Sequence, residues 1–289
     1  MTFTIIIPAH NEAATLSDCL ESLFLQTYPY FEVMVVNDGS QDETQTIIDA
    51  YCEKDARFHG IALPKSEHQP GAKVVNTFNE GLSAITPKEI ICKFDADIIF
   101  PQDYLEKIVA LYQSDERVGM ASGIVYILKD DVLLHKEKVF DFKDDNNWQF
   151  ESISSKNHVR GPIKSYRKEC FMAMNGLRPI LGWDNIDVML AQMNGFTVRT
   201  LPELWVKHLR PTAHLYRKEK YQKLGKYFRN IGLSFPLAAL SAFKVSLKDK
   251  NIISWWIMMR YFLTQPRPVV LSDEEIRFIR KLRWKMMGK

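Results

Sequence analysis

Short runs of β-branched and aromatic residues alternate with longer amphipathic segments through the first hundred residues of this chain, and this alternation restricts the fold more than any other feature. Strands are predicted at residues 3–7, 31–36 and 58–63, and helices at residues 11–26 and 71–84. Strands that alternate with helices form a mostly parallel sheet with helices packed on its faces. The sequence therefore predicts an α/β fold.

Polar residues follow three of the predicted strands. Residues 10–12 read His-Asn-Glu and come after the first strand, which Pro8 is expected to end. Residues 37–40 read Asn-Asp-Gly-Ser, a cluster of turn formers, and residues 95–97 read Asp-Ala-Asp. The carboxyl ends of parallel strands meet at one edge of a sheet, where ligands bind. We therefore expect these three segments to converge on one site.

Two acids, Asp95 and Asp97, interrupt the apolar run at residues 91–100. Alternate residues of a strand face the same side, so the two carboxylates would lie about one pleat apart. Such a pair suits Mg²⁺ or Mn²⁺, which prefer oxygen ligands, but it equally suits a strand end where an aspartate caps the next helix. Glu12 and Asp38 at the same edge favour the cation, because four acids would otherwise repel one another. A metal–diphosphate site is predicted.

Charge and cysteine content narrow the class of protein. A formal net charge of +3 over 289 residues gives no basis for nucleic-acid binding. The four cysteines are far apart in the chain, which predicts a reduced, cytoplasmic setting and argues against structural zinc. The N-terminus carries no export signal, and the longest apolar stretch, residues 231–243, is too short to cross a bilayer. No transmembrane helix is predicted.

The alternating pattern weakens after residue 117, so the chain divides into three parts, at residues 1–117, 118–210 and 211–289. The middle part carries strand patterns and one helix, and the last part is basic, aromatic and helical. The middle elements are predicted as strands at 118–128 and 161–167, a helix at 183–194, and one or two strands within 196–206.

The C-terminal part has two interpretations. Between Lys207 and Arg229, eight lysines and arginines accompany one acid, Glu219, and aromatic residues follow. The final helix opens on a capping box formed by Ser272 and Glu275. Such helices either bind an anionic membrane surface or pack on the rest of the protein with a solvated basic face. Two locations stay open: the cytoplasm, and the inner face of the membrane as a peripheral protein.

Four segments in this order carry a resemblance to a known family: IIIPAHNEAATLSDCLESL, VVNDGSQDET, FDADIIF and GWDNIDVMLAQMNGF. Together they resemble the family 2 glycosyltransferases over roughly residues 1–210. The resemblance implies a GT-A type fold, with a Rossmann-like, mostly parallel sheet flanked by helices, an acceptor-side lobe and a C-terminal helical extension. It also implies inverting, metal-dependent transfer of a hexosyl or N-acetylhexosaminyl group. The donor would be a nucleotide sugar, foremost a UDP-sugar, and the acceptor a hydroxyl of a glycan or lipid-linked molecule in bacterial polysaccharide or glycolipid synthesis.

The resemblance assigns the donor site position by position. Asp38 matches an acid that accepts a hydrogen bond from a pyrimidine ring, and Asp95 matches an acid near the ribose. Asp97 matches the acid that binds Mn²⁺ or Mg²⁺. His208 resembles a histidine that completes the metal shell or touches the diphosphate, although a lone histidine is more often structural. The residues expected to bind the donor are Pro8, Ala9, His10, Glu12, Asp38, Lys73, Asp95 and Ala96.

The catalytic base has two candidates, Asp184 and Asp187. Trp183 stands where the commoner family pattern has a glutamate, and counting back from Gly195 favours Asp184. The alternative roles are structural, since Asp184 suits a helix N-cap and Asp187 suits the first turn of a helix. On this interpretation the part before residue 118 binds the nucleotide sugar, and the middle part holds the acceptor and the base.

Two other functions compete with glycosyl transfer. A sugar nucleotidyltransferase would share the nucleotide-binding core, but IIIPAHNEAA lacks the Gly-rich phosphate loop and basic residue that such enzymes need. A catalytically silent scaffold in a polysaccharide assembly would not need to retain Asp38, Asp95, Asp97 and Asp184. The sequence leaves the donor sugar and the acceptor open.

Overall fold

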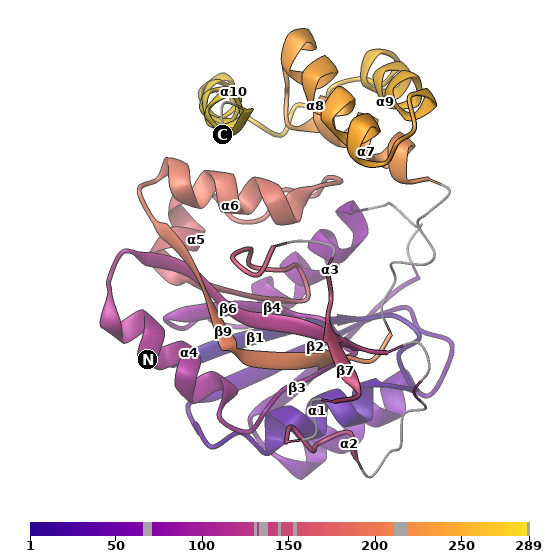
Figure 1. The fold of residues 1–289 in the computed structure, drawn as a ribbon. Coiled ribbons are helices and arrows are strands. Elements are labelled where there is room, and N and C mark those ends of the chain that lie inside the picture. The colour runs from indigo at the N-terminus through magenta and orange to yellow at the C-terminus, as the bar shows by residue number, and fades with distance from the viewer. Residues whose placement is uncertain are drawn as a thin grey trace.

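One mixed β-sheet forms the centre of the molecule (Figure 1). The computed structural model describes residues 1–65, 71–129, 132, 138–143, 146–152, 155–210 and 219–287. The strands in these residues are β1 (Phe3–Ala9), β2 (Phe31–Asp38), β3 (Phe58–Leu63), β4 (Ile90–Phe94), β5 (Ile98–Ile99), β6 (Val118–Leu128), β7 (Trp148–Phe150), β8 (Ile163–Arg167) and β9 (Thr197–His208). Their order is β3-β2-β1-β4-β8-β6-β9-β5, and β7 pairs with β6.

The first four strands in this order are parallel, as the alternating sequence predicts. The residues of β1, β2 and β4 are almost all buried, because helices cover both faces of the sheet. The expectation that Pro8 ends the first strand is wrong, since β1 continues to Ala9. Proline is tolerated there because β4 pairs with β1 only as far as Ile6, which leaves Pro8 a strand neighbour on one side alone.

The middle part of the chain extends the same sheet. β8 lies antiparallel between β4 and β6, and β6 runs parallel to β9. The predicted strand at residues 118–128 is confirmed, and the pattern at 196–206 forms the single strand β9. Because β9 also pairs with β5, its last residue, His208, lies opposite Ile98, one residue after the Asp-Ala-Asp segment.

Helices cover the two faces of the sheet with separate hydrophobic cores. On one face lie α1 (Leu16–Phe24), α2 (Thr44–Lys54) and α4 (Tyr104–Ser114), and on the other lie α3 (Ala72–Ser83), α5 (Lys168–Ala173) and α6 (Trp183–Met193). The second core continues into the C-terminal helices through residues such as Phe228 and Ile279. The C-terminal part is therefore packed onto the α6 side of the molecule.

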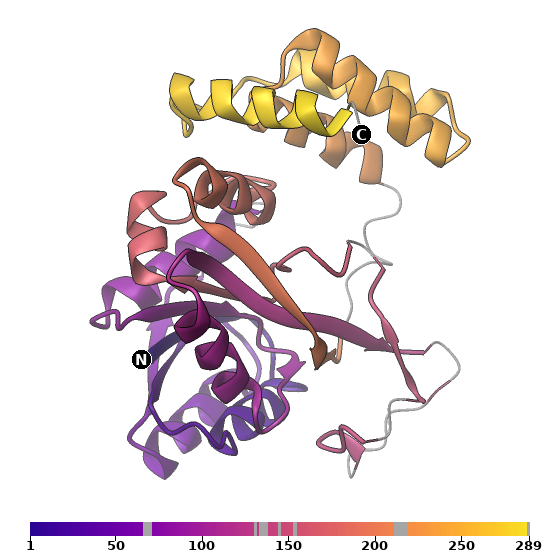
Figure 2. The same ribbon diagram turned by 60° about the vertical axis from the view of Figure 1, so that its left-hand side comes forward.

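Four C-terminal helices form a layer over α6 (Figure 2). They are α7 (Lys220–Asn230), α8 (Phe235–Lys248), α9 (Ile253–Thr264) and α10 (Asp273–Met287). The capping box predicted before α10 is present, because the Ser272 N–H donates to Glu275 Oε2 at 2.7 Å and the Glu275 N–H donates to Ser272 Oγ at 3.2 Å. In the described part of the chain, every helix is too short or too polar to cross a membrane.

Candidate active site

The loops after β1 and β2 are joined by hydrogen bonds at the carboxyl edge of the sheet. His10 Nδ1 lies 2.6 Å from the Asp38 carbonyl oxygen, and the Asn11 N–H donates to Ser40 Oγ at 2.9 Å. Asn11 adopts a left-handed backbone conformation with φ of 55°. These bonds explain why the helix predicted from residue 11 begins only at Leu16: the preceding residues form the loop that closes this edge of the site.

Asp38 ends β2 in a buried position beside α3. Lys73 Nζ lies 3.2 Å from Asp38 Oδ2, and the Thr77 hydroxyl donates to the same oxygen at 3.1 Å. Both partners come from α3, one helical turn apart, so they face the strand end together. The carboxylate of Asp38 is thus held in place at the edge of the sheet before any ligand binds.

Glu12 forms an ion pair with Arg210, which follows β9. Burial raises the pKa of Glu12, while the hydrogen bond and charge of Arg210 oppose that rise. The negative charge of Asp97 also raises this pKa, which indicates that the two carboxylates lie near each other. Arg210 is 53% exposed, so it is accessible to a charged ligand at this edge.

The Asp-Ala-Asp segment lies in the turn between β4 and β5, not within a strand, so the predicted strand geometry of the acid pair is wrong. The turn separates the two carboxylates. Asp95 pairs with Lys93, and Lys93 Nζ also lies 3.4 Å from the Gly161 carbonyl oxygen. Asp97 faces β9 instead. Asp95 and Asp97 are therefore paired with side chains of different strands, β4 and β9.

His208 lies between two acids at the end of β9. Its Nε2 is 3.4 Å from Asp97 Oδ2, and its Nδ1 is 3.4 Å from Glu151 Oε2. Glu151 is itself paired with Arg160 Nη2 at 2.8 Å. Burial lowers the pKa of His208, but hydrogen bonds to Asp97 and Glu151 outweigh it and raise the pKa to about 9.

Asp97 and His208 are suited to share a divalent cation. Metal-binding histidines commonly bond a carboxylate through the second ring nitrogen, as His208 does with Glu151, and this leaves Nε2 directed toward Asp97. In the residues that the structure describes, no group of three or more histidine, cysteine, aspartate or glutamate side chains is arranged to hold a metal ion. Two protein ligands with further positions left for phosphate oxygens are typical of Mg²⁺ and Mn²⁺ sites.

Asp187 is buried in the interior of the molecule. Its carboxylate accepts hydrogen bonds from Lys164 Nζ at 2.7 and 2.8 Å, from the Tyr166 hydroxyl at 2.6 Å and from the Val188 N–H at 2.7 Å. The side chains of Lys164 and Asp187 are 0% and 2% exposed. Burial raises the pKa of Asp187, and the charge of Lys164 opposes that rise.

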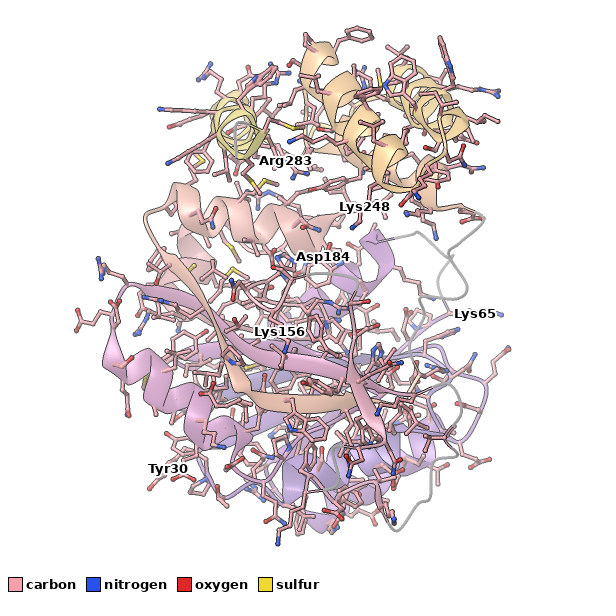
Figure 3. All side chains as sticks on the ribbon, viewed as in Figure 1. Tyr30, Lys65, Lys156, Asp184, Lys248 and Arg283 are labelled. Carbon is pink, nitrogen blue, oxygen red and sulfur yellow. The ribbon has the colours of Figure 1, made fainter. Side chains whose placement is uncertain are left out.

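Asp184 is partly exposed in the first turn of α6 (Figure 3). Lys164 Nζ donates to its backbone oxygen at 2.6 Å, so the buried network below α6 also fixes the backbone here. Gly182 precedes the helix with φ of 93°, and a Cβ atom at Gly182 would come within 2.2 Å of the Tyr227 ring on α7. The C-terminal layer therefore packs directly on the turn that sets the position of Asp184.

The structure brings most of the predicted site residues to one edge. Pro8 and Ala9 end β1, and Ala96 is buried in the turn between the two acids. Lys93, Glu151 and Lys164 were not predicted from the sequence. Lys93 interrupts an apolar strand, which is the same signal that drew attention to the acid pair. Lys164 lies in the mixed strand Ile-Lys-Ser-Tyr-Arg and Glu151 in a charged, irregular stretch, so neither gave such a signal.

Comparison with known proteins agrees with this architecture. The family model described as "Glycosyl transferase family 2" matches residues 4–175, which is more than half of the chain. The chain belongs to glycosyltransferase family 2. A "Glycosyltransferase GlyA" of Streptococcus pneumoniae is 34% identical over 149 residues, covering 48% of this chain and 20% of that protein. A "Poly-beta-1,6-N-acetyl-D-glucosamine synthase" of Staphylococcus epidermidis is 25% identical over 138 residues, covering 47% of this chain and 32% of the synthase.

Solved structures share the fold across the whole of this glycosyltransferase chain. The mannosyltransferase PcManGT from Pyrobaculum calidifontis, in complex with GDP-Man and Mn²⁺, superposes with a TM-score of 0.58 at 19% identity, covering 99% of this chain and 85% of that one. S. aureus TarS 1-349 in complex with UDP-GlcNAc gives a TM-score of 0.57 at 16% identity, covering 100% and 92%. The GT-A type fold with C-terminal helices is thereby confirmed. The chain spans less than half of the length of the two curated relatives above.

Proposed function

We propose that this family member is an inverting, metal-dependent glycosyltransferase that uses a nucleotide-diphosphate sugar, with a UDP-sugar as the first candidate. The observation that carries the proposal is the approach of His208 to Asp97 at 3.4 Å, at the edge that also holds Glu12 and Asp38. The acids gathered at this edge offer carboxylate oxygens, which are the ligands that Mg²⁺ and Mn²⁺ prefer. The resemblance of these positions to the family's donor site supports the same assignment.

In this proposal Asp38 accepts a hydrogen bond from the base of the nucleotide, and Asp95 lies on the ribose side. Asp97 and His208 hold Mn²⁺ or Mg²⁺, which when bound would stabilise negative charge on the diphosphate. Arg210 and Lys73 add positive charge to this edge, where they pair with Glu12 and Asp38. PcManGT was solved with GDP-Man and Mn²⁺, and TarS with UDP-GlcNAc, so both kinds of donor occur on this fold.

We propose Asp184 as the base. Asp187 belongs to the buried network below α6 that holds the backbone of Asp184 in place. A base must reach the acceptor hydroxyl, and Asp184 is partly exposed whereas Asp187 is buried and bonded to Lys164 and Tyr166. Asp184 Oδ2 lies 3.9 Å from the position that a Cβ of Gly161 would take, and the carbonyl of Gly161 contacts Lys93, the partner of Asp95. Gly161 therefore lies next to both the proposed base and the lysine that pairs with the ribose-side acid.

The acceptor that we propose is a hydroxyl of a glycan or lipid-linked molecule in surface polysaccharide or glycolipid synthesis, and the transferred group is a hexosyl or N-acetylhexosaminyl unit. The names of the synthase from S. epidermidis and of the mannosyltransferase support these two sugar classes. A cytoplasmic enzyme, either free or at the inner face of the membrane, would meet both the nucleotide sugar and a lipid-linked acceptor.

Hydrolysis of nucleotide sugars in the absence of acceptor tests the proposal against a silent scaffold. Purified protein is incubated with UDP- and GDP-sugars, with and without Mn²⁺, and the release of nucleoside diphosphate is measured. We expect slow release from one donor with Mn²⁺ that stops on chelation and is lost in Asp97→Asn. A protein that binds a donor, as seen by thermal shift, but never releases the diphosphate would be a scaffold.

A further inference from the structure

Exposed apolar side chains are concentrated on the C-terminal helices. Among the described residues, fifteen large hydrophobic side chains are exposed, and eleven of them lie between Phe235 and Met286. Scattered exposed apolar residues are normal on a soluble protein, but a concentration on one region marks an interaction surface. The C-terminal helices bury Ile276 and Ile279 against the rest of the chain, so this concentration is not what holds the layer in place.

On α8 and α9 the exposed apolar residues form a stripe on each helix. Leu240, Phe243 and Leu247 recur on α8 at spacings of three and four, and Trp256 and Leu263 lie seven residues apart on α9. Hydrogen bonds join the two helices, since the hydroxyls of Ser246 and Ser254 are 2.7 Å apart and Trp255 Nε1 donates to the Ala239 oxygen at 3.0 Å. Ser246 and Ser254 are buried at this contact, whereas both stripes are exposed.

The same layer of helices carries exposed positive charge. Arg277, Lys281 and Lys285 recur every four residues along α10, are exposed, and lie opposite the buried residues Ile276 and Ile279. Arg260 is exposed between Trp256 and Leu263 on α9. Over residues 219–287 there are fourteen lysines and arginines and five acids. The outer side of this layer is turned away from the sheet, and side chains project from it (Figure 3).

We propose that the outer face of α8, α9 and α10 docks on an anionic lipid bilayer surface. The apolar stripes would enter the boundary between headgroups and acyl chains, while the lysines and arginines contact anionic headgroups. A second copy of the chain fits this face less well, because self-association would bring the same positive charges together. Docking does not depend on the proposed function, although it would place the enzyme next to a lipid-linked acceptor.

Vesicle flotation with the whole chain tests the proposal. The probes are vesicles of phosphatidylcholine alone and of phosphatidylcholine mixed with phosphatidylglycerol, each at low and at high salt. We expect binding to the mixed vesicles at low salt, with a loss of about fivefold in the partition coefficient for each lysine removed in Lys281→Gln and Lys285→Gln. The pair Trp256→Ser with Leu263→Ser should also weaken binding.

Control variants carry similar changes on elements outside α8, α9 and α10. Met172→Ser removes an exposed methionine of α5, and Arg199→Gln removes an exposed cation of β9. Binding of these controls should equal that of the natural sequence. The proposal is overturned if the chain does not float with mixed vesicles, if the controls weaken binding equally, or if the α9 pair abolishes a dimer in solution instead. Donor hydrolysis by every variant, measured without vesicles, reports the proposed function separately.

Discussion

Replacement of Lys164 by methionine should destabilise the protein by about 3–5 kcal/mol, because it leaves the carboxylate of Asp187 buried without its counter-charge. The structure gives the reason for this size. Lys164 Nζ contacts both oxygens of Asp187 and the backbone oxygen of Asp184, and its side chain is wholly buried. Methionine has a similar length and fills the space, so the main change is the lost charge and its three hydrogen bonds.

The assay is urea unfolding at several values of pH, followed by circular dichroism. Without Lys164, burial would raise the pKa of Asp187 with less opposition, so the carboxyl binds a proton more readily in the folded state. An acid whose folded pKa is raised contributes stability that is complete below its unfolded pKa and is lost as pH rises from there through the folded pKa, so the deficit of Lys164→Met should be larger at pH 8 than at pH 5.5. Adding Asp187→Asn should recover part of the loss at pH 8.

The matched control is Lys54→Met, which removes a more exposed ion pair with a similar distance between nitrogen and oxygen. Lys54 Nζ lies 2.6 Å from Glu21, but the two side chains are 40% and 30% exposed, so we expect a change of about 0–1 kcal/mol. If Lys164→Met is no more destabilising than this control, or if its deficit is independent of pH, then the Lys164–Asp187 pair is not the buried support of α6 that we describe.

Three further predictions follow from the site and the fold. Glu151→Gln should weaken Mn²⁺ binding about 10–100-fold, because it weakens the partner that orients His208; isothermal titration with Mn²⁺ and nucleoside diphosphate measures this. Ser272→Ala should lower the unfolding free energy by about 1 kcal/mol in urea unfolding, because it removes one bond of the capping box before α10. Hydrogen bonds from Arg57 lower the pKa of Asp55, so this pair stabilises the folded protein at neutral pH and its contribution should fade as pH falls below 3.8. The thermal unfolding temperature of Asp55→Asn should therefore converge with that of the natural chain in acid.

The strands of the parallel half of the sheet could be predicted from the sequence, because they are buried on both faces and bounded by turn formers. The strand at 31–36 extends two residues further, to Asp38, and the acid that ends it is a predicted site residue. The first strand passes through Pro8 because it has a paired strand on only one side there, and a single sequence does not show which neighbours a strand has.

The supports of the site could not be predicted, because they depend on contacts between distant residues. Lys164 and Asp187 are 23 residues apart in the chain and meet only when β8 packs below α6. Glu151 reaches His208 across 57 residues. The pattern of α10 was clear, but its periodicity could not show that Ile276 and Ile279 face the protein; the fold decides this, and leaves the basic side outward.

The most direct measurement of the central claim compares Asp184→Asn with Asp187→Asn for sugar transfer, donor binding and unfolding free energy. We expect Asp184→Asn to lose transfer by roughly 10²–10⁴-fold, as expected on loss of a general base, while donor affinity and stability stay close to those of the natural chain. Asp187→Asn should lose stability. An active Asp184→Asn beside a folded, inactive Asp187→Asn would contradict the account.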